Sequence, residues 1–214
     1  MVSDMNNLAV KCRPVWLALG LLLLTALTAC SDSAMPEVEA LVYEQARPLS
    51  DFSLQDQNAQ PVTKQTLLGQ WNLVFLGYTS CPDICPLTLA KLKSVYNALH
   101  ADYPLQIWFL AVDPKRDTTA KRKAYIDYFN PDFLAVSGEH KDLFPLVREL
   151  GLIYAISNSD EPEYAVDHSA SIAMVDPQGA VRAIFKPEFK QGSVPLINAK
   201  LLITEFKQIA DYYQ

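Results

Sequence analysis

The stretch Leu73-Val-Phe-Leu-Gly-Tyr78, followed directly by Thr79-Ser-Cys-Pro-Asp-Ile-Cys-Pro86, decides the fold of this chain. Its first part is short, apolar and rich in strand-forming side chains, which predicts a buried strand. Apolar side chains then recur at helical spacing, at Leu89, Leu92, Tyr96 and Leu99. This spacing predicts a helix with one buried face, and the proline at position 86 suits its first turn.

Two cysteines, Cys81 and Cys85, lie where the strand passes into the helix. A helix N-terminus carries partial positive charge and unpaired N–H groups, so it favours the thiolate over the thiol. Because positions i and i+4 are one helical turn apart, both sulfurs can face the same point. They can form a disulfide or bind one soft metal ion. A loop of about five residues constrains the unfolded chain little, so the spacing favours chemistry over a structural crosslink.

The composition bounds the size of the domain and argues against one class of partner. The 214 residues suffice for one domain with a sizeable core and appendages, and half of them are apolar. The net charge of −6 and the lack of a basic stripe argue against nucleic acid as a partner.

The N-terminal residues 1–29 have the pattern of a secretory signal. Lys11 and Arg13 precede an apolar run over 15–28, and small residues lead up to Cys30. This run is shorter than the roughly 20 apolar residues that a comfortable membrane span needs. The segment ending at Cys30 resembles a bacterial lipoprotein signal, in which this cysteine receives lipid; an uncleaved signal anchor is the alternative.

In both cases we expect an exported, membrane-anchored protein that faces the periplasm. Residues 30–47 lack a clear hydrophobic period and are expected to form a tether, and residues 48–214 are expected to form the domain. Only Cys81 and Cys85 then remain as free cysteines of the mature domain. In an oxidising compartment such a pair forms either a structural or a redox-active disulfide.

The rest of the chain predicts an α/β architecture. Residues 73–78 and the apolar run 105–112 flank a helix, which makes a βαβ unit with parallel strands. The other expected elements are a hairpin over 49–68, a helix over 118–129 capped by Asp117 or Thr118, a strand over 133–136, a helix over 140–150 containing Pro145, an extended segment over 152–156, an acidic loop over 158–165, a hairpin of 171–175 and 181–185, and a helix over 194–213. This order is that of a thioredoxin-like fold, a central mixed sheet flanked by helices with N-terminal and C-terminal hairpin elaborations.

The chain has three histidines that could act as a partner to the two cysteine sulfurs. His100 ends a helix and His140 opens a polar turn, so both are expected to be exposed. His168 lies after the acidic loop and just before a core strand. In a thioredoxin-like fold, this strand passes beside the loop that carries Cys81 and Cys85, here called the reactive loop. From its position alone, an ordinary loop histidine and a metal ligand are equally compatible with the sequence.

Four segments, in order, resemble the Sco/SenC family of copper chaperones: Tyr78–Pro86, Ala111–Thr118, Tyr164–Ser169 and Ala173–Gly179. The resemblance spans about residues 48–208. It implies a thioredoxin fold and one copper ion, Cu(I) or Cu(II), bound by Cys81, Cys85 and His168. It also implies a role in assembling the copper centre of a haem-copper cytochrome oxidase, with the copper-site subunit or another copper or thiol protein as partner.

Two thiolates and an imidazole suit Cu(I) and can also hold Cu(II), whereas structural zinc prefers four ligands. Met174 is a conceivable ligand but is expected in the core, and Asp167 is expected to point away from its neighbour His168. Asp83 is expected either to tune the thiols or to be exposed. Asp113 and Arg116 follow the second central strand and are expected either near the site or as helix caps.

The main alternative is an enzyme, a thiol-disulfide oxidoreductase in which Cys81 and Cys85 form the redox-active pair. Thioredoxin-type enzymes have two residues between the cysteines, whereas this chain has three. That difference and the presence of His168 favour metal binding. Peroxide removal is disfavoured because no Lys or Arg lies in 82–90, and an inert disulfide remains a further alternative.

Overall fold

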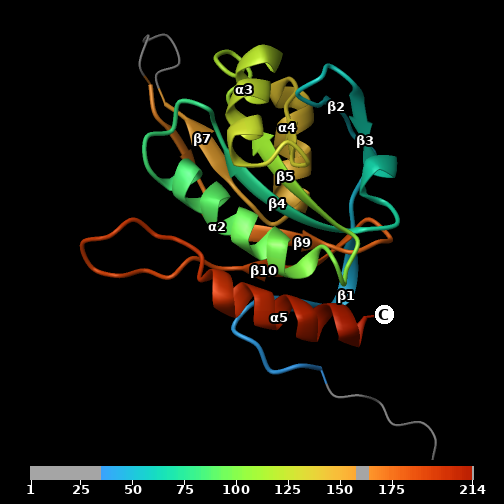
Figure 1. The fold of residues 1–214 in the computed structure, drawn as a ribbon. Coiled ribbons are helices and arrows are strands. Elements are labelled where there is room, and N and C mark those ends of the chain that lie inside the picture. The colour runs from blue at the N-terminus through green and yellow to red at the C-terminus, as the bar shows by residue number, and fades with distance from the viewer. Residues whose placement is uncertain (1–34, 158–163, 214) are drawn as a thin grey trace, which may run out of the picture. The chain divides into compact units, whose positions relative to one another are not determined.

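A six-stranded mixed sheet with helices on both faces forms the centre of the domain (Figure 1), in a computed structural model that describes residues 35–157 and 164–213. The elements in chain order are β1 (Leu41–Pro48), β2 (Ser53–Gln55), β3 (Pro61–Thr63), the 3-10 helix η2 (Lys64–Leu67), β4 (Trp71–Gly77), α2 (Ile84–Leu99), β5 (Leu105–Ala111), α3 (Thr119–Phe129), β6 (Leu134–Val136), α4 (His140–Glu149), β7 (Tyr154–Ile156), β8 (Val166–His168), β9 (Ile172–Val175), β10 (Ala180–Phe185) and α5 (Ala199–Tyr212). The α/β class and the mixed sheet agree with the prediction.

The sheet has the strand order β1-β10-β9-β4-β5-β6. Strands β4 and β5 are parallel and in register from Trp71 opposite Leu105 to Gly77 opposite Ala111, and β6 continues the parallel part. Strands β9, β10 and β1 add an antiparallel half. The predicted βαβ unit therefore forms the middle of the sheet, and its strands end at one edge, where ligands bind in open α/β folds.

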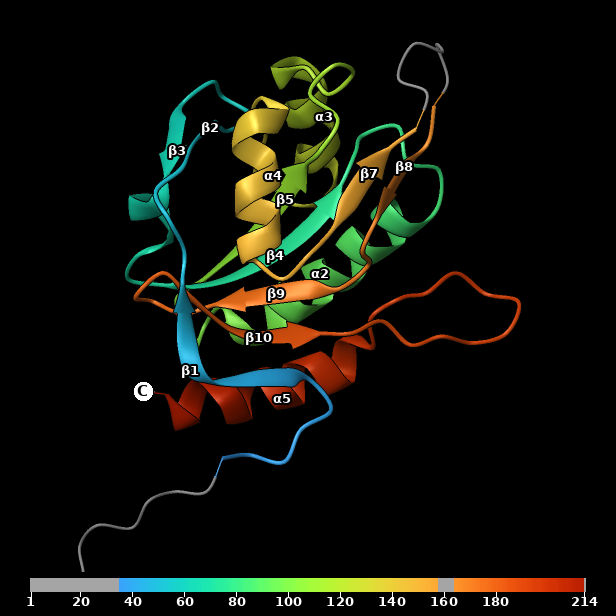
Figure 2. The same ribbon diagram turned by 180° about the vertical axis from the view of Figure 1, so that it is seen from behind.

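The buried side chains of β4 alternate between the two faces of the sheet. Leu73 and Phe75 pack into a core with α2 and α5, while Val74 and Leu76 pack into a second core with α4 and the β2–β3 hairpin. Figures 1 and 2 show these layers from opposite sides. Because both faces are covered, β4 reads in the sequence as a continuous apolar run.

The predicted hairpins are both present. Strands β2 and β3 pair over residues 53–63, and β9 and β10 pair across the turn at Asp176. The Asp176 carboxylate accepts the backbone N–H of Gln178 and of Ala180, and Gly179 adopts a φ of +79°. A glycine meets this positive φ without strain, so the turn is encoded locally.

Two expected boundaries are wrong. Residues 41–47, assigned above to the tether, form most of β1, and the unit of the chain that contains the sheet begins at Glu37. The sequence pattern does not indicate β1, because β1 is an edge strand whose side chains are mostly exposed and whose apolar and polar residues do not alternate regularly. Helix α5 begins at Ala199 and not at position 194, because Asn198 is its N-cap and accepts the N–H of Leu201.

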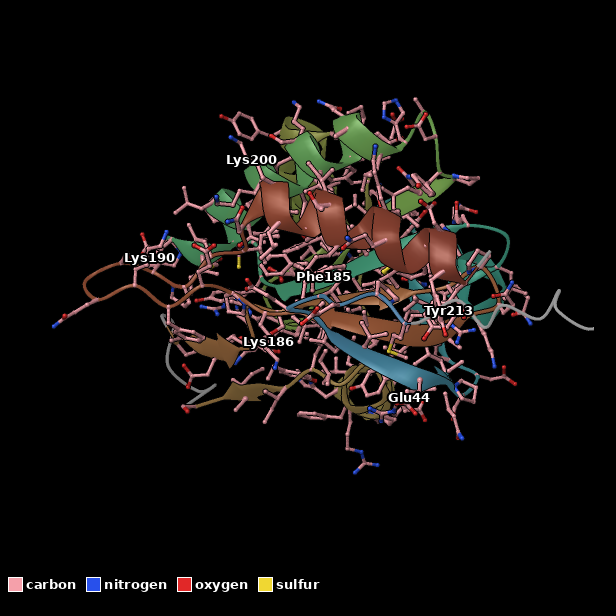
Figure 3. All side chains as sticks on the ribbon, turned by 90° about the horizontal axis from the view of Figure 1, so that it is seen from below. Glu44, Phe185, Lys186, Lys190, Lys200 and Tyr213 are labelled. Atoms are coloured by element: carbon pink, nitrogen blue, oxygen red, sulfur yellow. The ribbon has the colours of Figure 1, made fainter. Side chains whose placement is uncertain are left out.

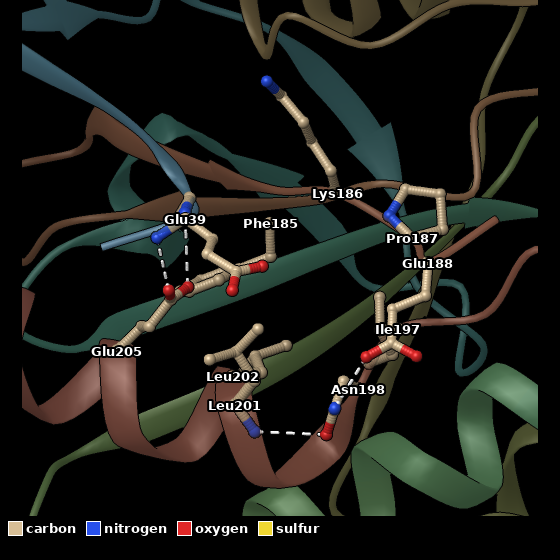
Figure 4. A pocket seen from close by; sticks show the side chains of 11 residues that line it. Glu39, Phe185, Lys186, Pro187, Glu188, Ile197, Asn198, Leu201, Leu202 and Glu205 are labelled. Atoms are coloured by element: carbon tan, nitrogen blue, oxygen red, sulfur yellow. Dashed lines mark hydrogen bonds between the residues drawn. The ribbon is translucent and has the colours of Figure 1, made fainter.

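Helix α5 fixes the place where the chain enters β1. The buried Glu205 carboxylate accepts the backbone N–H groups of Glu39, at 2.5 Å, and of Ala40, at 3.3 Å (Figure 4). Just after the last residue of the helix, the Tyr213 hydroxyl donates to the carbonyl of Tyr43. Figure 3 labels Tyr213 at the C-terminal end of α5. These contacts hold the start of β1 against α5.

Within the described ranges, no helix is long and apolar enough to cross a membrane. The expected signal over 1–29, the lipidation site Cys30 and residues 158–163 of the acidic loop lie outside those ranges.

Candidate metal centre

The reactive loop places both cysteines at the N-terminus of α2. The helix begins at Ile84 with Asp83 as N-cap residue, so Cys85 lies in its first turn and Cys81 lies just before it. The Cys85 backbone N–H points at the Cys81 sulfur, with an N–Sγ distance of 3.5 Å. Cys85 is fully buried and Cys81 is half-buried, and both are free thiols.

A separate two-stranded sheet brings the third residue to the sulfurs. Strand β8 pairs with β7, His168 opposite Tyr154, and its last residue His168 faces the helix. The Nε2 atom of His168 lies 3.4 Å from the Cys85 sulfur. The two sulfurs and an imidazole nitrogen all lie within 4.8 Å of one another. The predicted convergence of Cys81, Cys85 and His168 is thus present.

The donor atoms lie close to the positions that one metal ion would require. Bonds of about 2.0–2.3 Å to nitrogen and sulfur place the donors of a three-coordinate ion roughly 4 Å apart or less. The three donor atoms here all lie within 4.8 Å of one another, so the widest pair needs to close by at most about 1 Å. Among the described residues, this is the one group of three or more potential ligands from His, Cys, Asp and Glu with this spacing.

The imidazole of His168 is held on several sides. The ring contacts Phe75 and Tyr78 edge-on, with centroid distances of 5.9 and 6.1 Å. Its Nδ1 atom lies 3.1 Å from the carbonyl oxygen of Ser169. A carbonyl can only accept, so Nδ1 carries the proton in this contact and Nε2 presents its lone pair to the sulfurs.

The two thiols have different acidities. Hydrogen bonds from the Cys85 thiol and from the backbone N–H groups of Cys85 and Asp83 lower the pKa of Cys81 to about 4, against the opposing effect of partial burial. The hydrogen bond to Cys81 and burial raise the pKa of Cys85 well above the ordinary value. Cys81 is therefore the thiolate of the resting pair, and Cys85 holds the proton.

The loop after β5 supports the cysteine side of the site. The Asp117 carboxylate accepts both the backbone N–H of Thr79, at 3.0 Å, and the Thr79 hydroxyl, at 2.6 Å. Asp117 is 1% exposed, and burial raises its pKa. Since Thr79 lies two residues before Cys81, this contact fixes the start of the reactive loop.

The same loop also supports the histidine side. The Tyr164 hydroxyl donates to the fully buried Asp113 carboxylate at 2.6 Å, and burial together with this carboxylate raises the pKa of Tyr164 to about 12. Arg116 pairs with Asp113 and stacks its guanidinium 3.6 Å above the Tyr164 ring. Tyr164 leads into β8, so Asp113 and Arg116 hold the segment that carries His168. They lie near the site, which was one of the two expected alternatives.

None of the other side chains considered for the site joins the three donors. His100 is exposed at the end of α2 and contacts the Tyr96 carbonyl, as expected. The expectation for His140 is wrong, because it is half-buried against the Tyr154 hydroxyl, 2.9 Å away. Met174 is fully buried in the core. Asp83 and Asp167 are exposed, so neither provides a buried carboxylate to the site.

Several supporting residues escaped the sequence analysis: Gly77, Thr79, Tyr164 and Ser169. A glycine inside a buried strand signals a close approach of another group, so Gly77 carried a readable signal. The partners of the other three are distant in the chain or depend on backbone geometry, and no local pattern indicates them.

This arrangement defines a class, a thioredoxin-like protein with a three-donor soft-metal site at a helix N-terminus. The SCO1/SenC family model matches residues 42–198. A relative from Stutzerimonas stutzeri, named as a candidate copper-binding protein, is 31% identical over 184 residues, which cover 85% of this chain and 90% of the relative. The chain belongs to the SCO1/SenC family.

Two further comparisons extend this result. The mitochondrial Sco2 homologue of Mus musculus is 41% identical over 133 residues, which cover 60% of this chain and 52% of that protein. The chain thus matches about half the length of this relative. The structure of Bradyrhizobium japonicum ScoI with copper bound is 30% identical, with a TM-score of 0.61, and the match covers 78% of this chain and 98% of that one.

Proposed function

We propose that this protein binds one copper ion through the sulfurs of Cys81 and Cys85 and Nε2 of His168, and delivers it as cargo during assembly of a cytochrome oxidase. The observation that carries the proposal is the convergence of these three atoms within 4.8 Å. Family membership and the copper-bound structure of a relative support it.

The donor set explains why the cargo is copper. Two thiolates and an imidazole are soft ligands that satisfy Cu(I) at low coordination number, and they also hold Cu(II). A closed zinc site takes a fourth ligand. Met174, in β9, is a further soft side chain, but it is fully buried in the core cluster.

The same geometry supports release to a partner. Cys85 is fully buried, whereas Cys81 and His168 are half-buried, so an incoming thiol or imidazole reaches the ion from the side of these two residues. The proposed recipient is the copper-site subunit of the oxidase or another copper or thiol protein. The proposed location, exported and membrane-anchored on the periplasmic side by the signal or by lipid on Cys30, follows from residues 1–30.

Copper binding is expected to require the dithiol. A disulfide between Cys81 and Cys85 removes two of the three donors, so reduced protein should bind about one copper ion per chain and oxidised protein none. Copper content after gel filtration, measured by elemental analysis with the thiols counted in parallel, checks this. Equal copper content of the two forms, or reduced protein that takes up none, would contradict the proposal.

The unequal thiols favour a second candidate function, reduction of a disulfide in a partner protein. The Cys81 thiolate would attack one partner sulfur and form a mixed disulfide, while the partner's other sulfur leaves as a thiolate. Cys85 would then attack Cys81, giving the Cys81–Cys85 disulfide and the second partner thiolate. The partner gains two electrons and the Cys85 proton, and this chain is oxidised by the same two electrons.

This second function requires Cys81 to be the reactive thiol, which alkylation of copper-free, reduced protein measures. With a pKa of about 4, Cys81 should react at a nearly constant rate from about pH 5 to pH 8 and lose reactivity only as the pH falls through 4. An ordinary thiol instead gains about tenfold in rate per pH unit below its pKa. Peptide mapping after iodoacetamide treatment gives the rate for each cysteine. A Cys81 profile that still rises at pH 8 would contradict the assignment, and Cys85 serves as the unreactive internal control.

A further inference from the structure

Ser169, the residue after His168, makes an unusual set of hydrogen bonds to Ile153 on the neighbouring strand. In a regular antiparallel pair, two opposite residues exchange both backbone N–H···O=C bonds. Here the Ser169 N–H donates to the Ile153 carbonyl at 2.9 Å, but the Ile153 N–H donates to the Ser169 hydroxyl oxygen at 3.1 Å. The Ser169 hydroxyl in turn donates to the Ile153 carbonyl at 3.2 Å.

The hydroxyl therefore takes the place that the Ser169 carbonyl has in a regular pair. One hydroxyl can donate its hydrogen and accept another, so all three bonds form at once. Among the described residues, the strand pairing does not use the carbonyl of Ser169, and its oxygen lies 3.1 Å from Nδ1 of His168. The side chain of one residue thus makes its own carbonyl available to orient the imidazole before it.

We propose that Ser169 is a positioning residue, whose hydroxyl frees its carbonyl to hold His168 in the tautomer that directs the Nε2 lone pair at the two sulfurs. The inference rests on the proposed function only in so far as His168 is a copper ligand. The hydrogen bond on the outer nitrogen of a ligating histidine fixes the tautomer and the ring orientation, and its loss typically lowers metal affinity 10–100-fold.

The ring contacts of His168 cannot replace this bond. Phe75 and Tyr78 meet the imidazole edge-on and restrict the plane of the ring. Neither packing contact distinguishes a protonated Nδ1 from a protonated Nε2. His168 has the Ser169 carbonyl as hydrogen-bond partner at Nδ1 and the Cys85 sulfur at Nε2, so the carbonyl is the group that selects the tautomer.

The wild-type protein gives the first test. Two-bond ¹H–¹⁵N correlations of copper-free, reduced, ¹⁵N-labelled protein, at a pH high enough for neutral imidazole, report which ring nitrogen carries the proton. The signals of His168 are assigned by their loss in the His168→Ala protein. We expect protonated Nδ1 and bare Nε2. A protonated Nε2 in the wild-type protein would overturn the inference, whatever the variants do.

Two variants test the role of the hydroxyl. In Ser169→Ala the Ile153 N–H loses its partner and competes for the Ser169 carbonyl, so His168 should show a mixture of tautomers and Cu(II) affinity should fall about tenfold. Ser169→Thr keeps a hydroxyl in an extended backbone and should restore both the tautomer and the affinity. Competition with a chromophoric Cu(II) chelator measures the affinity.

The outcomes separate this inference from the proposed function. If the alanine protein keeps protonated Nδ1 and wild-type copper affinity, Ser169 does not position His168, although copper binding stands. If wild-type protein fails to bind copper while the alanine and threonine proteins differ in tautomer as expected, the positioning by Ser169 stands and the copper function falls.

Discussion

His168→Ala protein should bind Cu(II) at least about 100-fold more weakly than the wild-type protein, a larger loss than that of a supporting residue. The substitution removes the nitrogen donor, whose Nε2 lies 3.4 Å from the Cys85 sulfur, and leaves two sulfurs. Two thiolates still suit Cu(I), because this soft ion accepts a low coordination number. Cu(I) affinity should therefore fall less than Cu(II) affinity. Competition titrations against a chelator of each oxidation state measure the two losses separately.

Cys85→Ser should abolish the binding of both oxidation states, because a hydroxyl does not replace a thiolate as a soft ligand. His100→Ala is the matched control, since His100 is exposed at the far end of α2 and bonds to the Tyr96 carbonyl. It should leave both affinities unchanged. Wild-type Cu(II) affinity in the His168→Ala protein would show that the third ligand is wrongly assigned and that the site is the dithiol alone.

The parts of this site that could be predicted are those whose structure is indicated by a pattern of neighbouring residues in the sequence. The strand before Cys81 and the helix after it were predictable because buried runs and helical spacing are written in consecutive residues. The position of His168 was not, because β7 and β8 form a small sheet of their own outside the central one. From the residues alone, His168 could be either a metal ligand or an ordinary loop histidine. Only the family resemblance indicated a ligand.

The supporting residues could not be predicted for a different reason. Asp117 bonds to Thr79, 38 positions away, and Asp113 bonds to Tyr164, 51 positions away. The first pair forms only when the parallel strands β4 and β5 have brought the loops at their carboxyl ends together. The second pair forms only when the segment that leads into β8 has packed against the loop after β5. A sequence pattern can place Asp113 and Asp117 at that edge, but which groups they contact depends on the packed fold.

Gly77, at the end of β4, determines where the buried sulfur can lie. A Cβ atom built on this residue would stand 2.5 Å from Cε2 of Phe109 and 2.9 Å from the Cys85 sulfur. Phe109 and Cys85 are both fully buried, so neither can swing into solvent. The backbone cannot retreat either, because Gly77 pairs with Ala111 and its carbonyl accepts the N–H of Val112 at 2.9 Å.

Gly77→Ala should therefore displace the Cys85 sulfur and destroy the copper site while the protein still folds. Overpacking of this kind typically costs about 1–3 kcal/mol, which lowers the melting temperature of a domain this size by roughly 2–4 °C per kcal/mol. Gly138→Ala is the matched control, because its Cβ would stand 2.5 Å from a Leu54 side-chain carbon, in the other core cluster. Both proteins should melt earlier, but only Gly77→Ala should lose copper. Unchanged copper affinity in Gly77→Ala would mean that the buried sulfur tolerates a shift larger than a closed three-donor site allows.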